Sequence, residues 1–186
     1  MGKRILICSG GTGGHIYPAQ SLAKELNKKC SVEILFAGGN LSTNRWFESD
    51  KFKYQDISCA SFSLRKGLGN FLSAFKILRG VFESIKLIRK FKPNLIVGFG
   101  SFHTFPTLIA ACITRKTIYL HEQNKQMGKV NRIFARWAKK IFVSFPKTFP
   151  EFENKSVHVQ MPLKFCKEDS LSKFLNVYQD KVEQTK

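Results

Sequence analysis

The chain has 186 residues, of which 43% are hydrophobic, and this is enough for one well-packed α/β domain but short for two. Lys and Arg number 31 against 13 Asp and Glu, and the resulting formal charge of +18 attracts polyanions or an anionic membrane. The five cysteines are odd in number and widely spaced, which argues against a disulfide framework and a metal site and favours a reducing cytosol.

Two common partners of a basic chain are weakly supported by the sequence. No zinc-finger spacing and no aromatic run typical of RNA-binding sheets accompanies the charge, so we expect no nucleic-acid partner. No apolar run reaches the ~18 residues that a spanning helix needs, so we expect any membrane contact to be peripheral. We also expect no metal and no cofactor.

Apolar runs of strand length alternate with segments of helical period, which is the pattern of a parallel sheet with crossover helices. Pro18 and Pro106 suit first helical turns, where a missing N–H costs nothing. The expected strands are residues 3–8, 32–37, 54–58, 95–98, 117–121, 141–144 and, more weakly, 157–160. The expected helices are residues 18–28, 43–50, 68–91, 106–114 and 129–139.

The first predicted strand runs into a glycine-rich turn, residues 9–15, that reads SGGTGGH. Four glycines between a strand and a helix let the backbone approach a ligand closely and expose N–H groups, so we expect an anion there. The turn is neither a dinucleotide fingerprint, because Ile16 occupies the third glycine position, nor a phosphate-binding P-loop, because no Gly-Lys-Ser/Thr follows. Glycines that merely permit a tight turn would not call for the histidine that follows them.

Residues 10–19, GGTGGHIYPA, resemble the signature of the UDP-N-acetylglucosamine transferases that convert lipid I to lipid II in peptidoglycan synthesis, the MurG family. The resemblance implies a Rossmann-like parallel sheet with helices on both faces, the N-terminal domain of a GT-B glycosyltransferase. It places His15 at the family's proposed general base, a role that imidazole can fill near neutral pH. It also implies donor contacts from Thr12, Gly13 and Gly14, and an acceptor-diphosphate contact from Gly11.

Residues 98–106, GFGSFHTFP, resemble the second glycine loop of this family and precede a predicted helix whose free N–H groups favour phosphate. The resemblance implies that Gly100, Ser101 and Thr104 bind the acceptor diphosphate. Ser101 stands where the family usually has Gly and Phe102 where it usually has Tyr. A serine at this position is expected to change the backbone geometry, because only glycine adopts positive φ freely.

Residues 121–124, HEQN, lie at the end of the fifth predicted strand, the edge at which ligands of open α/β sheets gather. In the family that this motif resembles, its last residue contacts the donor sugar, which implies that role for Asn124. His121, Glu122 and Gln123 are interpreted as bracing residues. An alternative is that His121 and Glu122 pair with each other and touch no ligand.

The predicted helix 68–91 is amphipathic and unusually basic. Ile77, Val81 and Ile88 are expected in the core. The matching segment of the family carries a hydrophobic patch ringed by basic residues that sits on anionic lipid, and a basic amphipathic helix binds in this way without spanning. The resemblance therefore implies a membrane contact through Phe71, Phe75, Leu78, Lys76 and Arg79.

The resemblance covers about residues 3–164 and only the first half of a family member. Residues 1–164 are interpreted as an acceptor-binding domain and residues 165–186 as a polar tail or truncated linker. The C-terminal donor-binding domain is interpreted as absent from this sequence. Lys164 falls where the family usually has an arginine that contacts the donor, and it keeps the positive charge without the guanidinium fork.

The resemblance implies an inverting hexosyltransferase that moves N-acetylglucosamine from UDP-N-acetylglucosamine to an undecaprenyl-diphosphate-linked muramyl pentapeptide. We expect it on the cytoplasmic face of the inner membrane, with a separate chain as a candidate for the C-terminal half. Two alternatives stay open: a non-catalytic binder of polyprenyl-diphosphate lipid or an inactive fragment, and nucleic-acid binding driven by charge alone.

Overall fold

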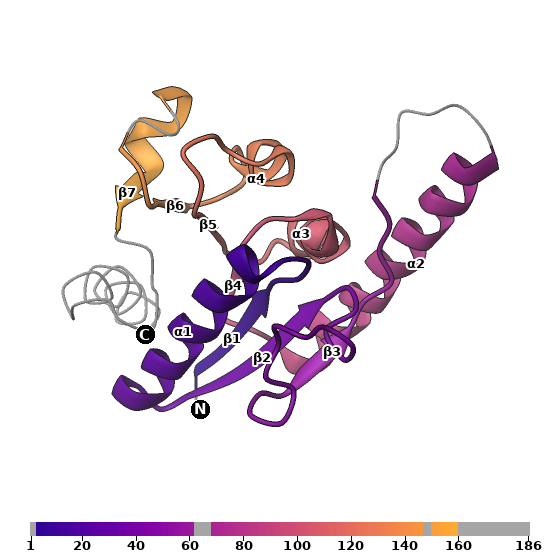
Figure 1. Cartoon of the computed structure of the whole chain (residues 1–186), viewed down its shortest axis with the longest axis horizontal. Helices are drawn as coiled ribbons and strands as arrows, with labels where there is room; N and C mark the ends of the chain where they lie inside the picture. Colours follow the sequence, from indigo (N-terminus) through magenta and orange to yellow (C-terminus); the bar gives the residue numbers. More distant parts are fainter. Residues whose placement is uncertain (1–2, 62–67, 147–149, 160–186) are drawn as a thin grey trace.

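The computed structural model describes residues 3–61, 68–146 and 150–159 (Figure 1). For residues 68–70 it describes the backbone alone. Lys164 and the expected tail, residues 165–186, lie outside the described residues.

Seven strands and four α-helices alternate along the described chain. The strands are β1 (Lys3–Cys8), β2 (Val32–Gly38), β3 (Tyr54–Asp56), β4 (Leu95–Gly98), β5 (Ile118–Glu122), β6 (Lys140–Val143) and β7 (Ser156–His158). The helices are α1 (Gly13–Lys29), α2 (Leu68–Phe91), α3 (Phe105–Ile113) and α4 (Lys129–Phe134), with short 3-10 turns η1 (Phe102–Thr104) and η2 (Pro150–Lys155).

The strands form one parallel sheet in the order β3-β2-β1-β4-β5-β6-β7. The chain winds outward from β1 in one direction through β2 and β3, and in the other direction through β4 to β7. The order therefore reverses between β1 and β4. In open parallel sheets, ligands bind in the crevice at the carboxyl ends of such a strand pair.

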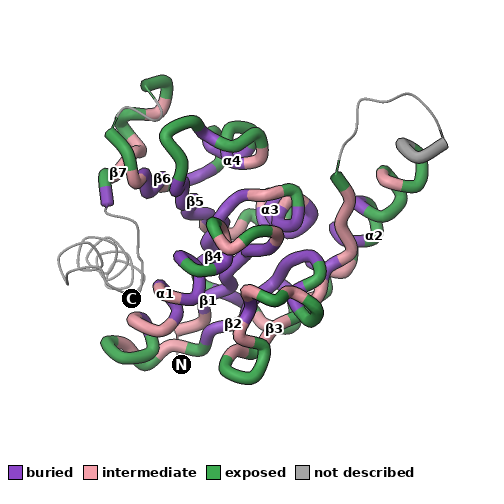
Figure 2. The backbone as a smooth tube through the Cα atoms, viewed as in Figure 1, coloured by how far each residue is buried: buried purple, intermediate pink, exposed green. Residues whose placement is uncertain are grey.

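Both faces of the sheet are covered, because successive side chains of a strand point to opposite faces. Ile5 and Ile7 of β1 pack in a core with the buried face of α1. Leu6 and Cys8 pack in a second core with residues of α2, α3 and α4. Burial follows this layering, with the central strands β1, β4 and β5 enclosed and the outer faces of α1 and α2 exposed (Figure 2). The expectation of a Rossmann-like parallel sheet with helices on both faces is confirmed.

Two helix boundaries differ clearly from the sequence-based prediction. Helix α1 begins at Gly13, so Pro18 lies in its second turn rather than its first, whereas Pro106 does lie in the first turn of α3. Helix α4 ends at Phe134 instead of continuing to residue 139.

The helix predicted at residues 43–50 is wrong, because the described chain forms turns there. Asp56 Oδ1 accepts hydrogen bonds from the backbone N–H groups of Leu41 and Ser42, and Asn44 Oδ1 accepts one from Trp46 N. Such side-chain to backbone bonds give the chain an alternative to the helical ladder.

Helix α2 is held close to the segment that follows β3. The Glu83 carboxylate accepts hydrogen bonds from Ser58 N at 2.8 Å and from Ser58 Oγ at 3.0 Å. A Cβ atom on Gly80 would lie 1.8 Å from the Ser58 carbonyl oxygen. The glycine therefore sets how closely the helix approaches this segment.

We expect Gly80→Ala to lower the free energy of unfolding by about 2 kcal/mol, because the added methyl forces the backbone apart. Helix propensity alone predicts the opposite sign, a gain of about 1 kcal/mol. Urea unfolding followed by circular dichroism distinguishes the two, with Lys90→Ala on an exposed position of the same helix as the control. A stabilised Gly80→Ala variant would contradict the close packing.

Candidate active site at the sheet switch point

Two glycine-rich turns leave the sheet side by side. Strand β1 pairs with β4 so that Cys8 lies opposite Gly98, and Phe99 N donates to the Cys8 carbonyl at 2.9 Å. The turn after β1 and the turn after β4 are consequently adjacent. A Cβ atom on Gly10 would lie 2.6 Å from His103 Cβ, so the close approach of the two turns depends on the missing side chain.

Three residues of these turns have positive φ: Gly11 at 84°, Gly100 at 82° and Ser101 at 71°. Ser101 has ψ of 151°, which places it in a region of backbone conformation used almost only by glycine. The expectation that serine changes the loop geometry is wrong in this respect, because Ser101 keeps a conformation typical of glycine. The serine bears a conformational cost instead.

His15, in the first turn of α1, points toward the turn after β4. Its Nδ1 lies 2.8 Å from the Phe99 carbonyl oxygen. A carbonyl oxygen only accepts hydrogen bonds, so Nδ1 carries the hydrogen and donates it to Phe99. The neutral imidazole then has a free lone pair on Nε2, which can accept a proton from a bound hydroxyl group.

Gln123 is buried beside this histidine, with its side-chain amide 2.7 Å from His15 Nδ1 through Nε2. An NH₂ group and a ring N–H repel each other, whereas an amide oxygen in that place would share the ring hydrogen with the Phe99 carbonyl. Gln123 Oε1 has no hydrogen-bond partner among the described residues. Rotating the amide by half a turn places Oε1 opposite the ring hydrogen and removes the repulsion, so Gln123 supports the same tautomer as Phe99.

Glu122 is almost fully buried and organises the segment after β5. Its Oε1 accepts from both N and Nδ2 of Asn124, each at 3.0 Å. Its Oε2 accepts from Gly128 N at 3.0 Å and from Asn131 Nδ2 at 2.9 Å. One carboxylate thus fixes the turn between β5 and α4, and it holds the exposed Asn124 at the carboxyl edge of the sheet.

His121 does not pair with Glu122, and that alternative is wrong. Its ring stacks on Phe99 with the centroids 5.0 Å apart, and neither ring nitrogen has a hydrogen-bond partner among the described residues. Burial lowers the pKa of His121 to about 4, so its imidazole is neutral near pH 7. His121 therefore packs behind the site, as the interpretation of a bracing residue requires.

The residues expected to contact the acceptor diphosphate and the donor differ in location and in exposure. Thr12 is exposed as the residue before α1, and Gly13 and Gly14 form the start of that helix. Gly11, Gly100 and Ser101 lie in the two adjacent turns. Thr104 is fully buried and its hydroxyl lies 3.0 Å from both the Gly100 and Ser101 carbonyls, so it braces the turn from within.

Helix α2 divides its apolar residues between two environments. Ile77, Val81 and Ile88 are buried, as predicted, whereas Phe71, Phe75 and Phe82 are 78%, 62% and 64% exposed. The end of α2 near Phe71 extends away from the sheet (Figure 1). A shallow hollow of about 430 Å³ lies on this exposed side, lined by Phe75, Leu78, Arg79, Phe82, Glu83 and Lys86.

The described residues contain neither a cluster of metal ligands nor a membrane-spanning helix. No three His, Cys, Asp or Glu side chains of residues 3–61, 68–146 and 150–159 converge in a way that would hold a metal ion. Within the same residues, no helix combines the length and apolar character needed to cross a bilayer.

Sequence reasoning found the histidine and the glycine turns but missed how they are connected. The Phe99 carbonyl is a backbone group and gives no residue-type signal. Gln123 did give a residue-type signal, because a polar residue at the end of a buried strand, next to Glu122, is expected to point to the opposite face of the sheet from Glu122.

A parallel sheet of this order, with two glycine-rich turns meeting at its switch point, matches the N-terminal domain of GT-B glycosyltransferases. The crystal structure of MurG from Acinetobacter baumannii matches it with a TM-score of 0.71 and 27% identity, over 86% of this chain and 45% of that one. UDP-N-acetylglucosamine 2-epimerase from Rickettsia bellii, at 12% identity and a TM-score of 0.63, shares the fold; the match spans 100% of this chain and 49% of that one.

Residues 5–143 match the model of the glycosyltransferase family 28 N-terminal domain, and the chain belongs to that family. Its relatives include the UDP-N-acetylglucosamine–N-acetylmuramyl-(pentapeptide) pyrophosphoryl-undecaprenol N-acetylglucosamine transferases of Protochlamydia amoebophila and Coxiella burnetii. They are 46% and 39% identical, over 88% and 80% of this chain. The matches cover 44% and 41% of those proteins, so the chain spans less than half the length of these relatives.

The conformation of Ser101 leads to a stability prediction. Replacing it with glycine removes a backbone cost of about 1–3 kcal/mol and adds up to about 1 kcal/mol of unfolded-state entropy. We expect Ser101→Gly to raise the free energy of unfolding by about 1 kcal/mol in urea unfolding. Ser101→Ala keeps a Cβ atom and should match the wild type, and an equal gain in both variants would contradict the strain.

Proposed function

We propose that this chain is the acceptor-binding half of an enzyme that transfers N-acetylglucosamine from UDP-N-acetylglucosamine to an undecaprenyl-diphosphate-linked muramyl peptide. The observation that carries the proposal is the orientation of His15 by the Phe99 carbonyl, between two glycine turns at the switch point of the sheet. Family membership and the names of the relatives support the choice of substrates.

His15 is assigned as the general base. Its Nε2 takes the proton from the muramyl 4-hydroxyl as that oxygen forms a bond to the anomeric carbon of the donor sugar. The bond from that carbon to the UDP oxygen breaks with its electron pair on the diphosphate, and the anomeric configuration inverts. The Nδ1–H bond to Phe99 favours this role, because it leaves Nε2 unprotonated in the neutral ring.

The two turns supply the anion-binding groups. Gly11, Gly100 and Ser101 present backbone N–H groups to the acceptor diphosphate, whereas Gly13 and Gly14, at the N-terminus of α1, offer the positive end of a helix dipole to the donor. Thr12, Asn124 and Lys164 are assigned to the donor. Glu122 supports Asn124 in this role through its two hydrogen bonds.

A donor-binding domain is needed for turnover, because transfer depends on holding both substrates in one geometry. We therefore propose that turnover requires, besides this acceptor-binding half, a donor-binding half that binds most of the UDP. The measurement is transfer of labelled N-acetylglucosamine to a lipid I analogue in anionic vesicles, with this chain alone and with the C-terminal half of a full-length relative.

We expect turnover only with both halves, reduced about 10²–10⁴-fold by His15→Ala, which is the range for loss of a general base. His158→Ala, at an exposed histidine on β7, is the matched control and should retain full activity. Acceptor binding that persists without turnover in any combination would favour the non-catalytic lipid-binding alternative. Full activity of His15→Ala would contradict the assigned base.

We further propose that the exposed face of α2 rests on the cytoplasmic surface of an anionic membrane, as a peripheral contact. Phe71, Phe75 and Leu78 are exposed apolar side chains, and Lys76 and Arg79 are exposed beside them. An exposed apolar helix face flanked by cations binds anionic lipid by combining burial of rings with charge attraction. Contact at this face would also keep the acceptor lipid near the crevice.

The membrane contact is tested by co-sedimentation with phosphatidylcholine vesicles that contain or lack phosphatidylglycerol. We expect Phe75→Ser to weaken partitioning into anionic vesicles about tenfold, since it removes most of one buried aromatic ring. Phe145→Ser, at an exposed position after β6, is the control. Equal binding of the wild type to neutral and anionic vesicles would contradict the contribution of Lys76 and Arg79.

A further inference from the structure

Three side chains beside the first glycine turn form a surface that the proposed roles do not use. Tyr17 and Trp46 make an edge-to-face pair with ring centroids 5.9 Å apart, and the Arg45 guanidinium lies 4.2 Å from the centroid of the Trp46 ring. Tyr17 is 45% exposed, Arg45 is exposed and Trp46 is half-buried. We name these three residues the aromatic shelf.

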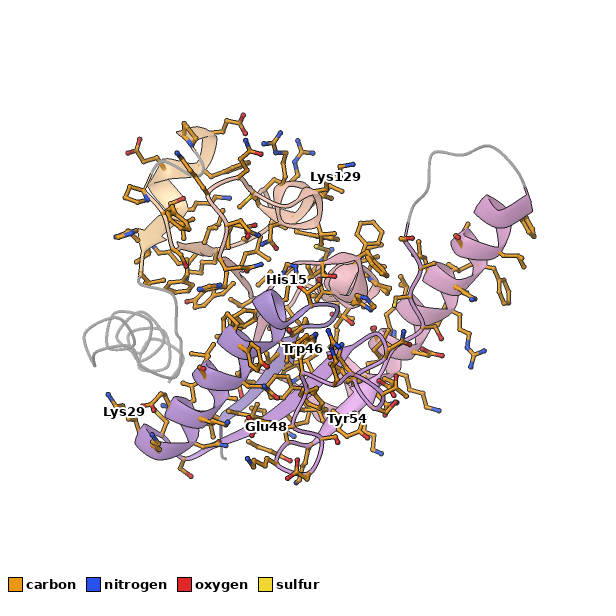
Figure 3. The ribbon with its side chains drawn as sticks, viewed as in Figure 1. His15, Lys29, Trp46, Glu48, Tyr54 and Lys129 are labelled. Carbon is orange, nitrogen blue, oxygen red and sulfur yellow. The ribbon has the colours of Figure 1, made fainter. Side chains whose placement is uncertain are left out.

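The shelf lies next to the proposed catalytic base. A Cβ atom on Gly13 would lie 2.9 Å from Tyr17 Cε2 and 3.6 Å from Trp46 Cδ2, so both rings pack directly on the glycine turn. Figure 3 shows Trp46 near His15, at the end of α1 opposite Lys29. The shelf and His15 therefore flank the same N-terminal end of α1, and a ligand that reaches across this end from His15 meets the shelf.

The shelf is held in place by hydrogen bonds to the turn and to α1. Asn44 Nδ2 donates to the Gly11 carbonyl at 2.8 Å, and Asn44 Oδ1 accepts from Trp46 N at 3.0 Å. Gln20 Nε2 donates to the Trp46 carbonyl at 3.2 Å. The segment that carries Arg45 and Trp46 is thus fixed relative to His15, which reduces the ordering cost of binding.

Arg45 has the properties of an anion receptor. It makes no ion pair with a carboxylate among the described residues, in contrast to Lys24 and Lys51, which both bind Glu48. The guanidinium lies over the Trp46 ring, and its N–H groups can form a bidentate bond to a carboxylate.

The covalent structure of a muramyl acceptor indicates which anion reaches this place. The peptide stem is attached through the lactyl ether oxygen on C3, the carbon next to the one that bears the reacting 4-hydroxyl, whereas the diphosphate is attached at C1 across the ring. When the 4-hydroxyl lies at His15, the carbon to which the stem is attached therefore lies beside the histidine. The stem ends in a carboxylate and has apolar side chains that suit aromatic rings.

We propose that the aromatic shelf binds the peptide stem of the acceptor, with Arg45 on a stem carboxylate and with Tyr17 and Trp46 against its apolar part. This inference rests on the proposed function, because it assumes that a muramyl acceptor occupies the crevice. It adds a subsite that selects acceptors carrying a charged peptide.

The test measures the affinity of the full chain for three soluble short-prenyl muramyl diphosphates by titration calorimetry. The first carries the pentapeptide, the second carries the pentapeptide with its carboxylates amidated, and the third has a neutral methylamide in place of the peptide. Each is titrated into the wild type, Arg45→Gln and Trp46→Leu. Arg136→Gln, which alters an exposed arginine 5.4 Å from the Trp137 ring, is the matched control.

For the wild type we expect amidation to weaken binding about tenfold, which is typical of losing one charge-assisted bond, and methylamide replacement to weaken it further. Arg45→Gln should weaken binding of the charged stem about tenfold and leave the amidated and methylamide analogues unchanged. Trp46→Leu should weaken both pentapeptide analogues, and Arg136→Gln should match the wild type.

Failure of the stem-binding inference can be distinguished from failure of the proposed function. If all three analogues bind the wild type equally, the proposed function stands and the aromatic shelf has no role in stem recognition. If Arg45→Gln weakens every analogue equally, the arginine acts on the diphosphate or on the fold, and the inference is overturned. If no analogue binds the wild type, the proposed function itself fails, and the inference fails with it.

Discussion

The parallel pairing of β1 with β4 is the constraint on which the candidate site depends. It aligns Cys8 with Gly98, so the two strands end at the same level and their glycine turns leave the sheet together. The ladder extends one residue further through Phe99 N and the Cys8 carbonyl. This leaves the Phe99 carbonyl within 2.8 Å of His15 Nδ1, and so the pairing of two strands orients the imidazole.

The site is built largely from backbone groups, and this explains both its glycines and its buried polar residues. Two turns approach each other only where side chains are missing, as the short distance from Gly10 to His103 shows. The buried polar side chains around these turns mainly form hydrogen bonds to backbone groups. Thr104 bonds the turn after β4, and Glu122 bonds the turn after β5. A carboxylate that accepts four N–H bonds needs no nearby cation to remain buried.

Much of the fold was predictable because parallel strands are short apolar runs bounded by turns, and glycine turns mark strand ends. All seven strands were expected close to their observed positions. The prediction of a helix at residues 43–50 was wrong because helical spacing of apolar residues does not account for Asn44 and Asp56. Their side chains accept hydrogen bonds from the backbone N–H groups of turns. His15 and the glycine turns were readable as residue types. The contact from Phe99 to His15 and the packing of Tyr17 against Trp46 arise only when distant segments meet, so no local pattern indicates them.

The acceptor for His15 Nδ1 is a main-chain oxygen, and this affects how the sequence can vary. A side-chain partner is lost by one mutation, whereas a carbonyl is present whatever residue occupies position 99. The turn after β4 can therefore exchange its side chains, provided that its backbone path is kept. Ser101 is an example, since it retains the φ of a glycine at 71°. The orientation of the histidine therefore depends on backbone geometry, and substitutions of the surrounding side chains that keep this geometry do not change it.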